Sequence, residues 1–358
     1  MGMIDGKNLH DMTWLRPISV AILMLVAGCG SNDRLSPSPE PPASAAPTPS
    51  DPVGEAPPDS AVGPADPTSG LPSDSTGIVG AIILASGTQP GIVFGSQGMG
   101  AEDLNSVHTG MLRGGGVTPD NVLSLLSAVR AKGGRIVLKM CMGEDKYVKN
   151  PDGTFSFTKW KMLVDRFKSV NLAQYISDGT LLGHFLIDEP HRTAKWGKII
   201  SQATVEAMAQ YSKQLWPSMP TYVRVVPSWL ASAPITYKAL DAGWLQYEAG
   251  KGNPATWVAS ETAIAKNRGL GLVIGLNILD GGNGSSGVPG WSKGKYAMSA
   301  AEIRTVGTAL LSQSYACGFF NWTYQYFGPT YYARSDIKSA LADLSSKAKA
   351  HVRTSCRQ

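Results

Sequence analysis

The sequence predicts an α/β protein, a (β/α)₈ barrel, over residues 78–358. Three observations support this fold class. Short apolar runs alternate with amphipathic helical segments, which is typical of βα units around a parallel sheet. Eight such runs follow one another from residue 91 onward. The region has 281 residues with no second linker inside it, close to the ~250 residues typical of such barrels.

The eight predicted strands are short, and most are bounded by turn residues. An open doubly wound sheet is the alternative, but no G-x-G-x-x-G motif follows an early strand, so the barrel is favoured. No long helix is predicted between residues 97 and 107, and the segment 77–86 is either an extra strand or a plug under the barrel. The strands are GIVFGS (91–96), HTGMLRG (108–114), RIVLKMC (135–141), LLGHFLID (181–188), TYVRVVPS (221–228), GWLQYE (243–248), GLVIGLNIL (271–279) and CGFFNWTY (317–324).

Helix caps and glycine stops mark the helices between these strands. Ser, Thr or Asn before a helix accepts hydrogen bonds from its first N–H groups, proline fits its first turn, and glycine often ends it. The run SDIKSALADLSSKAKAH closes the chain as an amphipathic helix. The predicted end signals are Thr118-Pro119 with Gly133, Asn253-Pro254 with Gly269, Ser299 with Glu302 as a capping box, and Thr158 and Ser201 as further caps.

The N-terminus has the layout of a secretory signal peptide. Arg16 precedes PISVAILMLVAG, an apolar run that is short for a membrane span, and Cys29 follows it. The ending VAGC resembles the lipobox of bacterial lipoproteins, in which the cysteine is lipidated. We therefore expect a signal peptide over 1–28 and a lipid anchor on Cys29 that holds the protein in the bacterial cell envelope, at the outer membrane or cell surface. An ordinary signal peptide or an uncleaved anchor is the alternative.

Residues 29–77 are dominated by Pro, Ser, Ala and Asp. Such a composition cannot bury enough apolar surface to offset the entropy lost on ordering, so the sequence predicts a disordered tether. A tether directly after a lipidated cysteine would hold the barrel domain away from the membrane.

The other cysteines, Cys141, Cys317 and Cys356, are odd in number and show no C-x-x-C spacing. We expect no disulfide and no zinc site, with Cys141 and Cys317 as small core residues. The five histidines are scattered, so neither a metal nor a cofactor is expected.

The charge of +5 is unevenly distributed. Residues 1–77 contain three Lys/Arg against nine Asp/Glu, which leaves 29 against 18 for the predicted domain. A basic domain can favour anionic polymers or the anionic envelope surface. There is no long Lys/Arg run, so nucleic acid is not an expected partner, and lysine-rich helix surfaces explain most of the excess.

Polar and aromatic residues gather where the predicted strands end. In (β/α)₈ barrels the active site lies at these carboxyl ends. The fourth strand ends at Asp188 and Glu189. The other strand-end residues expected to contact a substrate are Lys139, Trp229, Tyr247, Asn277, Asn321, Trp322 and Tyr324.

Carboxylates facing one another across a barrel mouth suit the cleavage of glycosidic bonds, where one carboxyl group donates a proton and another attacks the sugar or activates water. Glu189 is the predicted proton donor, with a pKa raised by burial or by Asp188. Strand alternation favours Glu189 facing inward with Gly183, Phe185 and Ile187, whereas His184 would accompany Asp188. The candidates for the second carboxylate are, in order, Glu248, Asp280 and Asp188 itself.

The motif at the end of the fourth strand resembles that of TIM-barrel glycoside hydrolases. In many of these enzymes this strand ends in Asn-Glu-Pro, and the glutamate is the general acid/base. The sequence DEP at 188–190 matches in Glu189 and Pro190 and departs in Asp188. The segments LQYE and FFNWTY are similar to sugar-binding strand ends of the same group. The resemblance implies a hydrolase of an extracellular or envelope saccharide, without assigning a family.

Two other functions stay open. The first is a catalytically silent carbohydrate-binding lipoprotein on the same barrel. The second is a lyase or aldolase in which Lys139 forms a Schiff base, although an ion pair with the carboxylates is the expected role of this lysine. Glu189 could also be only an exposed acid at a helix start before Pro190.

Overall fold

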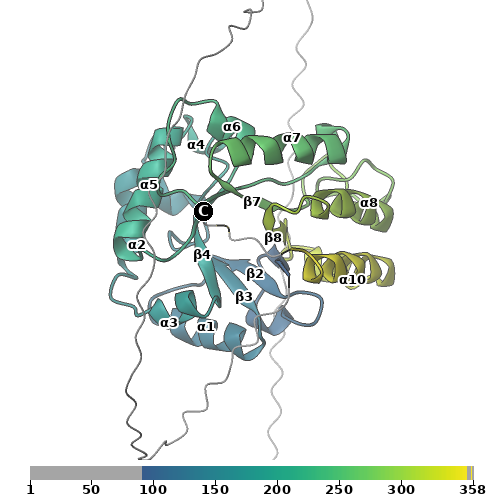
Figure 1. Cartoon of the computed structure of the whole chain (residues 1–358), viewed down its shortest axis with the longest axis horizontal. Helices are drawn as coiled ribbons and strands as arrows, with labels where there is room; N and C mark the ends of the chain where they lie inside the picture. Colours follow the sequence, from purple (N-terminus) through teal and green to yellow (C-terminus); the bar gives the residue numbers. More distant parts are fainter. Residues whose placement is uncertain (1–90, 353–355, 357–358) are drawn as a thin grey trace, which may run out of the picture. The chain divides into compact units, whose positions relative to one another are not determined.

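The computed structural model describes residues 91–352 and 356 (Figure 1). The predicted signal peptide, the lipidation site Cys29, the tether 29–77 and the segment 77–86 lie outside the described residues.

Eight parallel strands close into a barrel in sequential order, which confirms the predicted (β/α)₈ fold. The last strand pairs with the first, with Phe94 opposite Phe319. Helices surround the strands in a ring (Figure 1). The strands are β1 (Val93–Gln97), β2 (Gly110–Arg113), β3 (Arg135–Leu138), β4 (Leu181–Asp188), β5 (Thr221–Arg224), β6 (Ala242–Trp244), β7 (Gly271–Ile274) and β8 (Ala316–Asn321).

The helices separate the strands everywhere except between β1 and β2, where the connection holds only a short 3₁₀ turn, as expected for residues 97–107. The helical elements are η1 (Ala101–Asp103), α1 (Val122–Ala131), η2 (Asp145–Val148), α2 (Phe157–Asp165), α3 (Ala173–Ser177), α4 (Thr193–Trp196), α5 (Gln202–Leu215), α6 (Pro227–Ala231), η3 (Ala249–Lys251), α7 (Pro254–Asn267), α8 (Ala300–Leu311), α9 (Gly328–Tyr332) and α10 (Ser335–Lys349).

Most predicted helix caps are confirmed. Ser201 and Asn253 accept hydrogen bonds from the backbone N–H of the third residue of α5 and α7, and Ser299 with Glu302 forms the capping box of α8. Two starts were wrong: Ser156 rather than Thr158 caps α2, and α1 begins after Asn121, beyond Thr118. Both errors are shifts of two or three residues within the correct helix, because several Ser, Thr and Asn residues compete for each cap.

Most of the predicted strands were too long. The segments assigned to strands at 243–248 and 271–279 end as strands at Trp244 and Ile274. The apolar residues beyond these points, such as Leu245 and Leu276, are fully buried between the barrel and its helices. Burial in loops therefore extends the apolar runs beyond the hydrogen-bonded ladder.

The barrel interior is lined by one residue or a few from each strand. A β-bulge in β4, between Phe185 and Ile187, interrupts the alternation of side chains. Phe185 faces the interior, but Ile187 packs outside, in the cluster shared with the helices. His184 also packs outside, with its Nδ1 2.9 Å from Ser212 Oγ of α5. The favoured alternation was therefore wrong for Ile187, because a bulge cannot be read from alternation alone. The outward position of His184 agrees with that alternation, in which only an inward Asp188 would have carried His184 inward.

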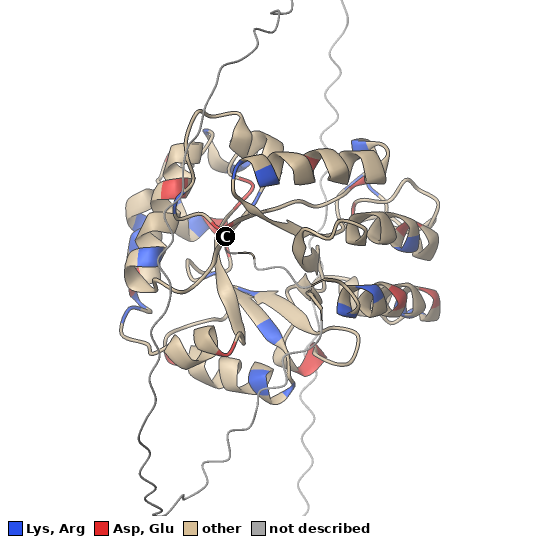
Figure 2. Ribbon diagram, in the orientation of Figure 1, with Lys and Arg blue, Asp and Glu red and all other residues tan. Residues whose placement is uncertain are grey.

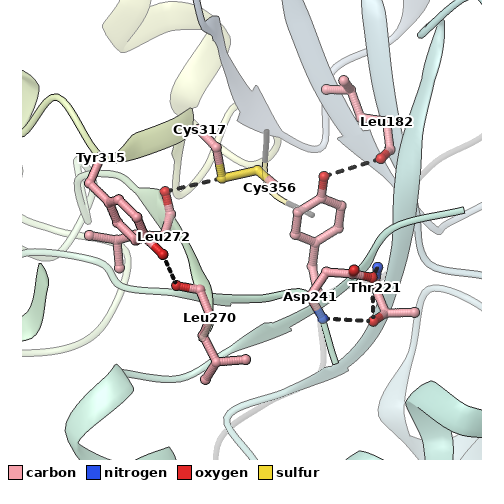
Figure 3. The surroundings of a disulfide bond; sticks show 9 residues. Leu182, Thr221, Asp241, Leu270, Leu272, Tyr315, Cys317 and Cys356 are labelled. Carbon is pink, nitrogen blue, oxygen red and sulfur yellow. Dashed lines mark hydrogen bonds between the residues drawn. A yellow bond between two sulfur atoms is a disulfide. The ribbon is translucent and has the colours of Figure 1, made fainter. Parts of the chain in front are cut away.

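The prediction that the chain has no disulfide was also wrong. Cys317 of β8 and Cys356 form a disulfide, with 5.2 Å between their Cα atoms (Figure 3). Both residues pack against the interior cluster of the barrel. Cys141 is buried and free, as expected. An odd number of cysteines in sequence concealed a pair that comes together only when the C-terminus returns to the first residues of β8.

Charged residues are distributed around the ring of helices rather than on one face (Figure 2). None of the helices in the described part of the chain is long and apolar enough to cross a membrane.

Candidate active site

Two adjoining cavities lie at the carboxyl ends of the strands. The first has a volume of about 320 Å³ and the second about 450 Å³. Glu189, Arg224 and Asp280 line both of them. The two cavities therefore share a wall at the end of β4, which is where the sequence placed the candidate carboxylates.

Asp188 is fully engaged by cations. Its Oδ1 accepts a hydrogen bond from Arg224 Nε; its Oδ2 accepts from Arg224 at 2.8 Å and from Lys195 Nζ at 2.5 Å. Burial opposes the charge of this carboxylate, but Arg224 and Lys195 outweigh it and hold the pKa of Asp188 well below its ordinary value. Both oxygens of Asp188 are thus bonded, and the carboxylate anchors Arg224 and Lys195 at the mouth.

The lowered pKa of Asp188 makes a prediction about acid stability. A carboxylate whose pKa is lower in the folded than in the unfolded state stabilises the folded protein. This contribution is complete at pH values above the pKa of the unfolded state, and it is lost as the pH falls from there towards the pKa of the folded state. We expect Asp188→Asn to lower the free energy of unfolding by about 2–3 kcal/mol at neutral pH. This difference from the wild type should shrink below about pH 4.

Denaturant titrations at several pH values would measure this difference. Asp120→Asn, which removes an exposed carboxylate, serves as the control and should show no comparable dependence. A difference between wild type and Asp188→Asn that stays constant down to pH 2 would contradict the ion-pair explanation.

Glu189 differs from Asp188 in keeping one oxygen free. Arg192 donates to its Oε2 at 2.7 Å, and Arg224 and Lys195 lie 3.3 and 3.8 Å from the same atom. No residue in the described ranges bonds Oε1. The backbone at Glu189 has φ +48, a left-handed conformation that is strained for a residue other than glycine.

The strained turn is held by its neighbours. Glu189 N donates to Arg224 O at 3.0 Å, and Trp196 Nε1 donates to the carbonyl oxygens of Asp188 at 3.0 Å and Glu189 at 3.1 Å. Backbone strain of this kind occurs where the surrounding structure fixes a functional side chain. The turn places two successive residues, Asp188 and Glu189, at the same mouth, which alternation along a regular strand would not do.

Lys139 lines the first cavity and is paired, as expected, although with a carboxylate that the sequence did not suggest. Its Nζ donates to Asp145 Oδ1 at 2.9 Å and to Gly143 O at 3.3 Å. Burial by itself would lower the pKa of Lys139, but charge interactions with Cys141 and Asp145 more than offset it and raise the pKa. A Schiff-base lysine must lose its proton, so this environment disfavours the lyase alternative.

Glu248 and Asp280 both line the second cavity. Asp280 accepts two hydrogen bonds from Ser292, one from the backbone N–H at 2.9 Å and one from the hydroxyl at 2.6 Å, so it organises the loop after β7. Glu248 is less constrained, because its nearest cation, Lys295, is 3.8 Å away. Glu248 is therefore the freer of the two carboxylates.

The predicted substrate-binding residues divide into two groups. Asn277 lines both cavities, and Lys139 and Trp322 line the first. The other four are absent from both linings. Tyr247 is buried with its hydroxyl donating to Gly252 O at 2.5 Å, and Asn321 is buried and accepts from Leu276 N at 3.2 Å. Trp229 packs against His191, and Tyr324 packs against Tyr332.

Three residues of the mouth, Arg192, Lys195 and Asp145, were not predicted. Arg192 and Lys195 follow the DEP motif at α4, and Asp145 begins η2; their spacing after a strand end was the only signal. Tyr326 lines the first cavity beside Trp322, and its ring stacks on that of Trp291, with centroids 4.0 Å apart. Within residues 91–352 and 356, no three His, Cys, Asp or Glu side chains are grouped so that they could hold a metal ion.

Fold and site together define a (β/α)₈ barrel whose mouth is polar and crossed by a network of ion pairs. No known family model matches the chain, and no curated protein matches its sequence. Solved structures resemble its fold at 12% identity. The match with the structure of a cellulase–inhibitor complex covers 71% of this chain and 92% of the other chain, with a TM-score of 0.48.

Two further structures are similar at the same identity. An endocellulase from Pyrococcus horikoshii with cellotetraose covers 73% of this chain and 92% of its own, with a TM-score of 0.46. A GH128 endo-β-1,3-glucanase from Amycolatopsis mediterranei with laminaritriose covers 72% and 100%, with a TM-score of 0.41. A shared barrel does not fix a function, so the chemistry of this mouth has to come from its own side chains.

Proposed function

We propose that this protein hydrolyses glycosidic bonds in a poly- or oligosaccharide. The observation that carries the proposal is the pairing of two carboxylates at one cavity. Glu189 and Glu248 come from different strand ends, line the same cavity and each keep an oxygen that no described residue bonds. Two carboxyl groups flanking a cavity at a barrel mouth are what glycoside hydrolysis requires.

The surroundings of the two glutamates support different roles. Three cations lie within 4 Å of Glu189 Oε2, and positive groups at this distance interact favourably with the negative charge that a nucleophile or base carries. Glu189 is thus the nucleophile, or the base that takes a proton from the attacking water. Glu248 donates a proton to the leaving glycosidic oxygen. The sequence suggested Glu189 as the proton donor, whereas this assignment gives that role to Glu248. Asp188 becomes a positioning residue.

Aromatic side chains support a saccharide substrate. Trp322 and Tyr326 line the first cavity, and Trp291, half exposed, stacks on Tyr326 at its rim. Flat apolar faces beside polar groups suit sugar rings, which present C–H bonds on one face and hydroxyls at the edge.

The role of Glu248 can be tested by leaving-group dependence. In Glu248→Gln we expect the rate of reducing-sugar release from a hydrolysed polysaccharide to fall about 10²–10⁴-fold, because the leaving oxygen receives no proton. Dinitrophenyl glycosides, whose leaving group needs no proton, should lose far less activity in the same variant. Equal losses on both substrates would refute this role.

The hydrolysis itself is tested by a panel of neutral, amino and uronic polysaccharides with the purified full chain. Release of sugar from at least one polymer supports the proposal. Binding without release would instead favour the catalytically silent carbohydrate-binding protein.

We also propose that the protein is exported and held at the bacterial envelope by a lipid on Cys29. The signal-peptide layout and lipobox support this location, and the disulfide between Cys317 and Cys356 is consistent with it, because disulfides persist mainly in oxidising compartments. Labelling with a radioactive fatty acid, lost in Cys29→Ser, tests the anchor.

A further inference from the structure

The second cavity offers an unusual number of hydrogen-bond donors. Arg192, Lys251 and Lys295 line it, together with the buried or half-buried side chains of Trp244 and Gln246. We propose that this cavity binds a carboxylate of the substrate, so that the saccharide contains a uronic acid or another carboxylated sugar. The inference rests on the proposed hydrolase function and names the class of its substrate.

The three cations at this cavity are only partly used by the protein. Arg192 is 53% exposed and donates one hydrogen bond, to Glu189. Lys295 is 54% exposed and lies 3.8 Å from Glu248, beyond hydrogen-bond distance. In residues 91–352 and 356, the Lys251 ammonium pairs with no carboxylate. All three therefore retain N–H donors for a ligand.

Of the three carboxylates in the same lining, Glu189 and Asp280 are recessed or already bonded, whereas Glu248 is 36% exposed and lies 3.8 Å from Lys295. Glu189 is 21% exposed and accepts from Arg192, while Asp280 is bonded twice by Ser292. Four cations, Arg192, Arg224, Lys251 and Lys295, thus accompany three carboxylates in this lining, so the positive charges outnumber the negative ones. Opposite charges in such a lining steer and orient a ligand.

Two residues of the cavity lining, Trp244 and Gln246, have buried donors without acceptors. Gln246 Oε1 accepts from Arg224, which leaves Gln246 Nε2 as a donor, and neither this atom nor Trp244 Nε1 has a partner in the described part of the chain. Buried polar groups without partners are rare and call for an explanation. A carboxylate has acceptors only, so it matches a lining that holds partly used cations and N–H donors without partners.

The test compares acidic polymers with their own neutral forms. Each uronic polysaccharide of the panel is measured beside the same polymer with its carboxylates reduced to primary alcohols, which preserves the linkages. Binding is measured by calorimetry and cleavage by reducing-sugar release, for the full-length wild type, a Lys251→Gln/Lys295→Gln variant and a Lys132→Gln control. Lys132 is exposed at the end of α1, at the opposite pole of the barrel.

We expect at least one acidic polymer to bind about tenfold more tightly than its reduced form. The double variant should lose most of this preference, high salt should weaken it, and Lys132→Gln should retain it. Equal binding of both forms, or a preference that survives in the double variant, would overturn the inference.

The two proposals fail in different ways. If a polymer is cleaved equally well in its acidic and reduced forms, hydrolysis stands and the carboxylate site is refuted. If an acidic polymer binds with the expected preference but is never cleaved, the carboxylate site stands and hydrolysis is refuted. If no acidic polymer binds, the carboxylate site is refuted.

Discussion

Glu189→Gln should reduce polysaccharide hydrolysis by about 10³-fold or more while the protein stays folded. The amide is nearly the same size as the carboxylate and still offers an oxygen to Arg192, so the ion-pair network around Asp188 is retained. It lacks the charge that a nucleophile or base needs. Initial rates on the best substrate of the panel, with thermal unfolding as the check on folding, would measure the effect.

A matched control separates the chemistry from the loss of a charge. Glu144→Gln makes the same change at an exposed glutamate that follows β3 and is absent from both cavity linings. It should leave the rate within about twofold of the wild type. If Glu189→Gln retained a tenth or more of the wild-type rate, Glu189 would not be the catalytic carboxylate.

Removing the disulfide should lower the free energy of unfolding by about 4 kcal/mol, because the bond closes a loop of some 40 residues and restricts the unfolded chain. Cys317 and Cys356 are 39 residues apart. Guanidinium titrations of oxidised wild type and of Cys356→Ser would measure the difference.

The reductant response provides the control for this experiment. Reduced wild type should unfold at the same denaturant concentration as Cys356→Ser, and the variant itself should not respond to reductant. If reduction of the wild type left its unfolding midpoint unchanged, the bond would add no stability.

The bond also fixes Cys356 against Gly271, where a Cβ would lie 2.7 Å from the Cys356 carbonyl oxygen.

Several features of the fold could be predicted because their signals are local. Capping by Ser201, Asn253 and Ser299 depends on residues within one turn of each helix. The alternation of apolar runs with helices requires that the strands be covered on both sides. The absence of a long helix between β1 and β2 could also be predicted from a local signal, because residues 97–107 have no helical periodicity.

The site was predictable only in part. The motif at Asp188 and Glu189 lies at a strand end, where barrels place their active sites, and the structure brings Glu248, Asp280, Asn277 and Trp322 to the same mouth. Aromatic and amide residues at other strand ends, such as Tyr247 and Asn321, point into the core instead. Their residue types suit both core and substrate contact, so composition alone could not separate the two.

The order of strands and helices follows from local sequence patterns, because hydrophobic periodicity and capping act over a few residues. Which charged groups contact one another depends on how the strands and loops are arranged in space. The bulge in β4 and the left-handed turn at Glu189 place two adjacent carboxylates at one mouth, and Arg224 from β5 and Lys195 from α4 converge on them. The disulfide likewise depends on a chain end returning to a distant strand. Such meetings depend on long-range geometry, which no local pattern specifies.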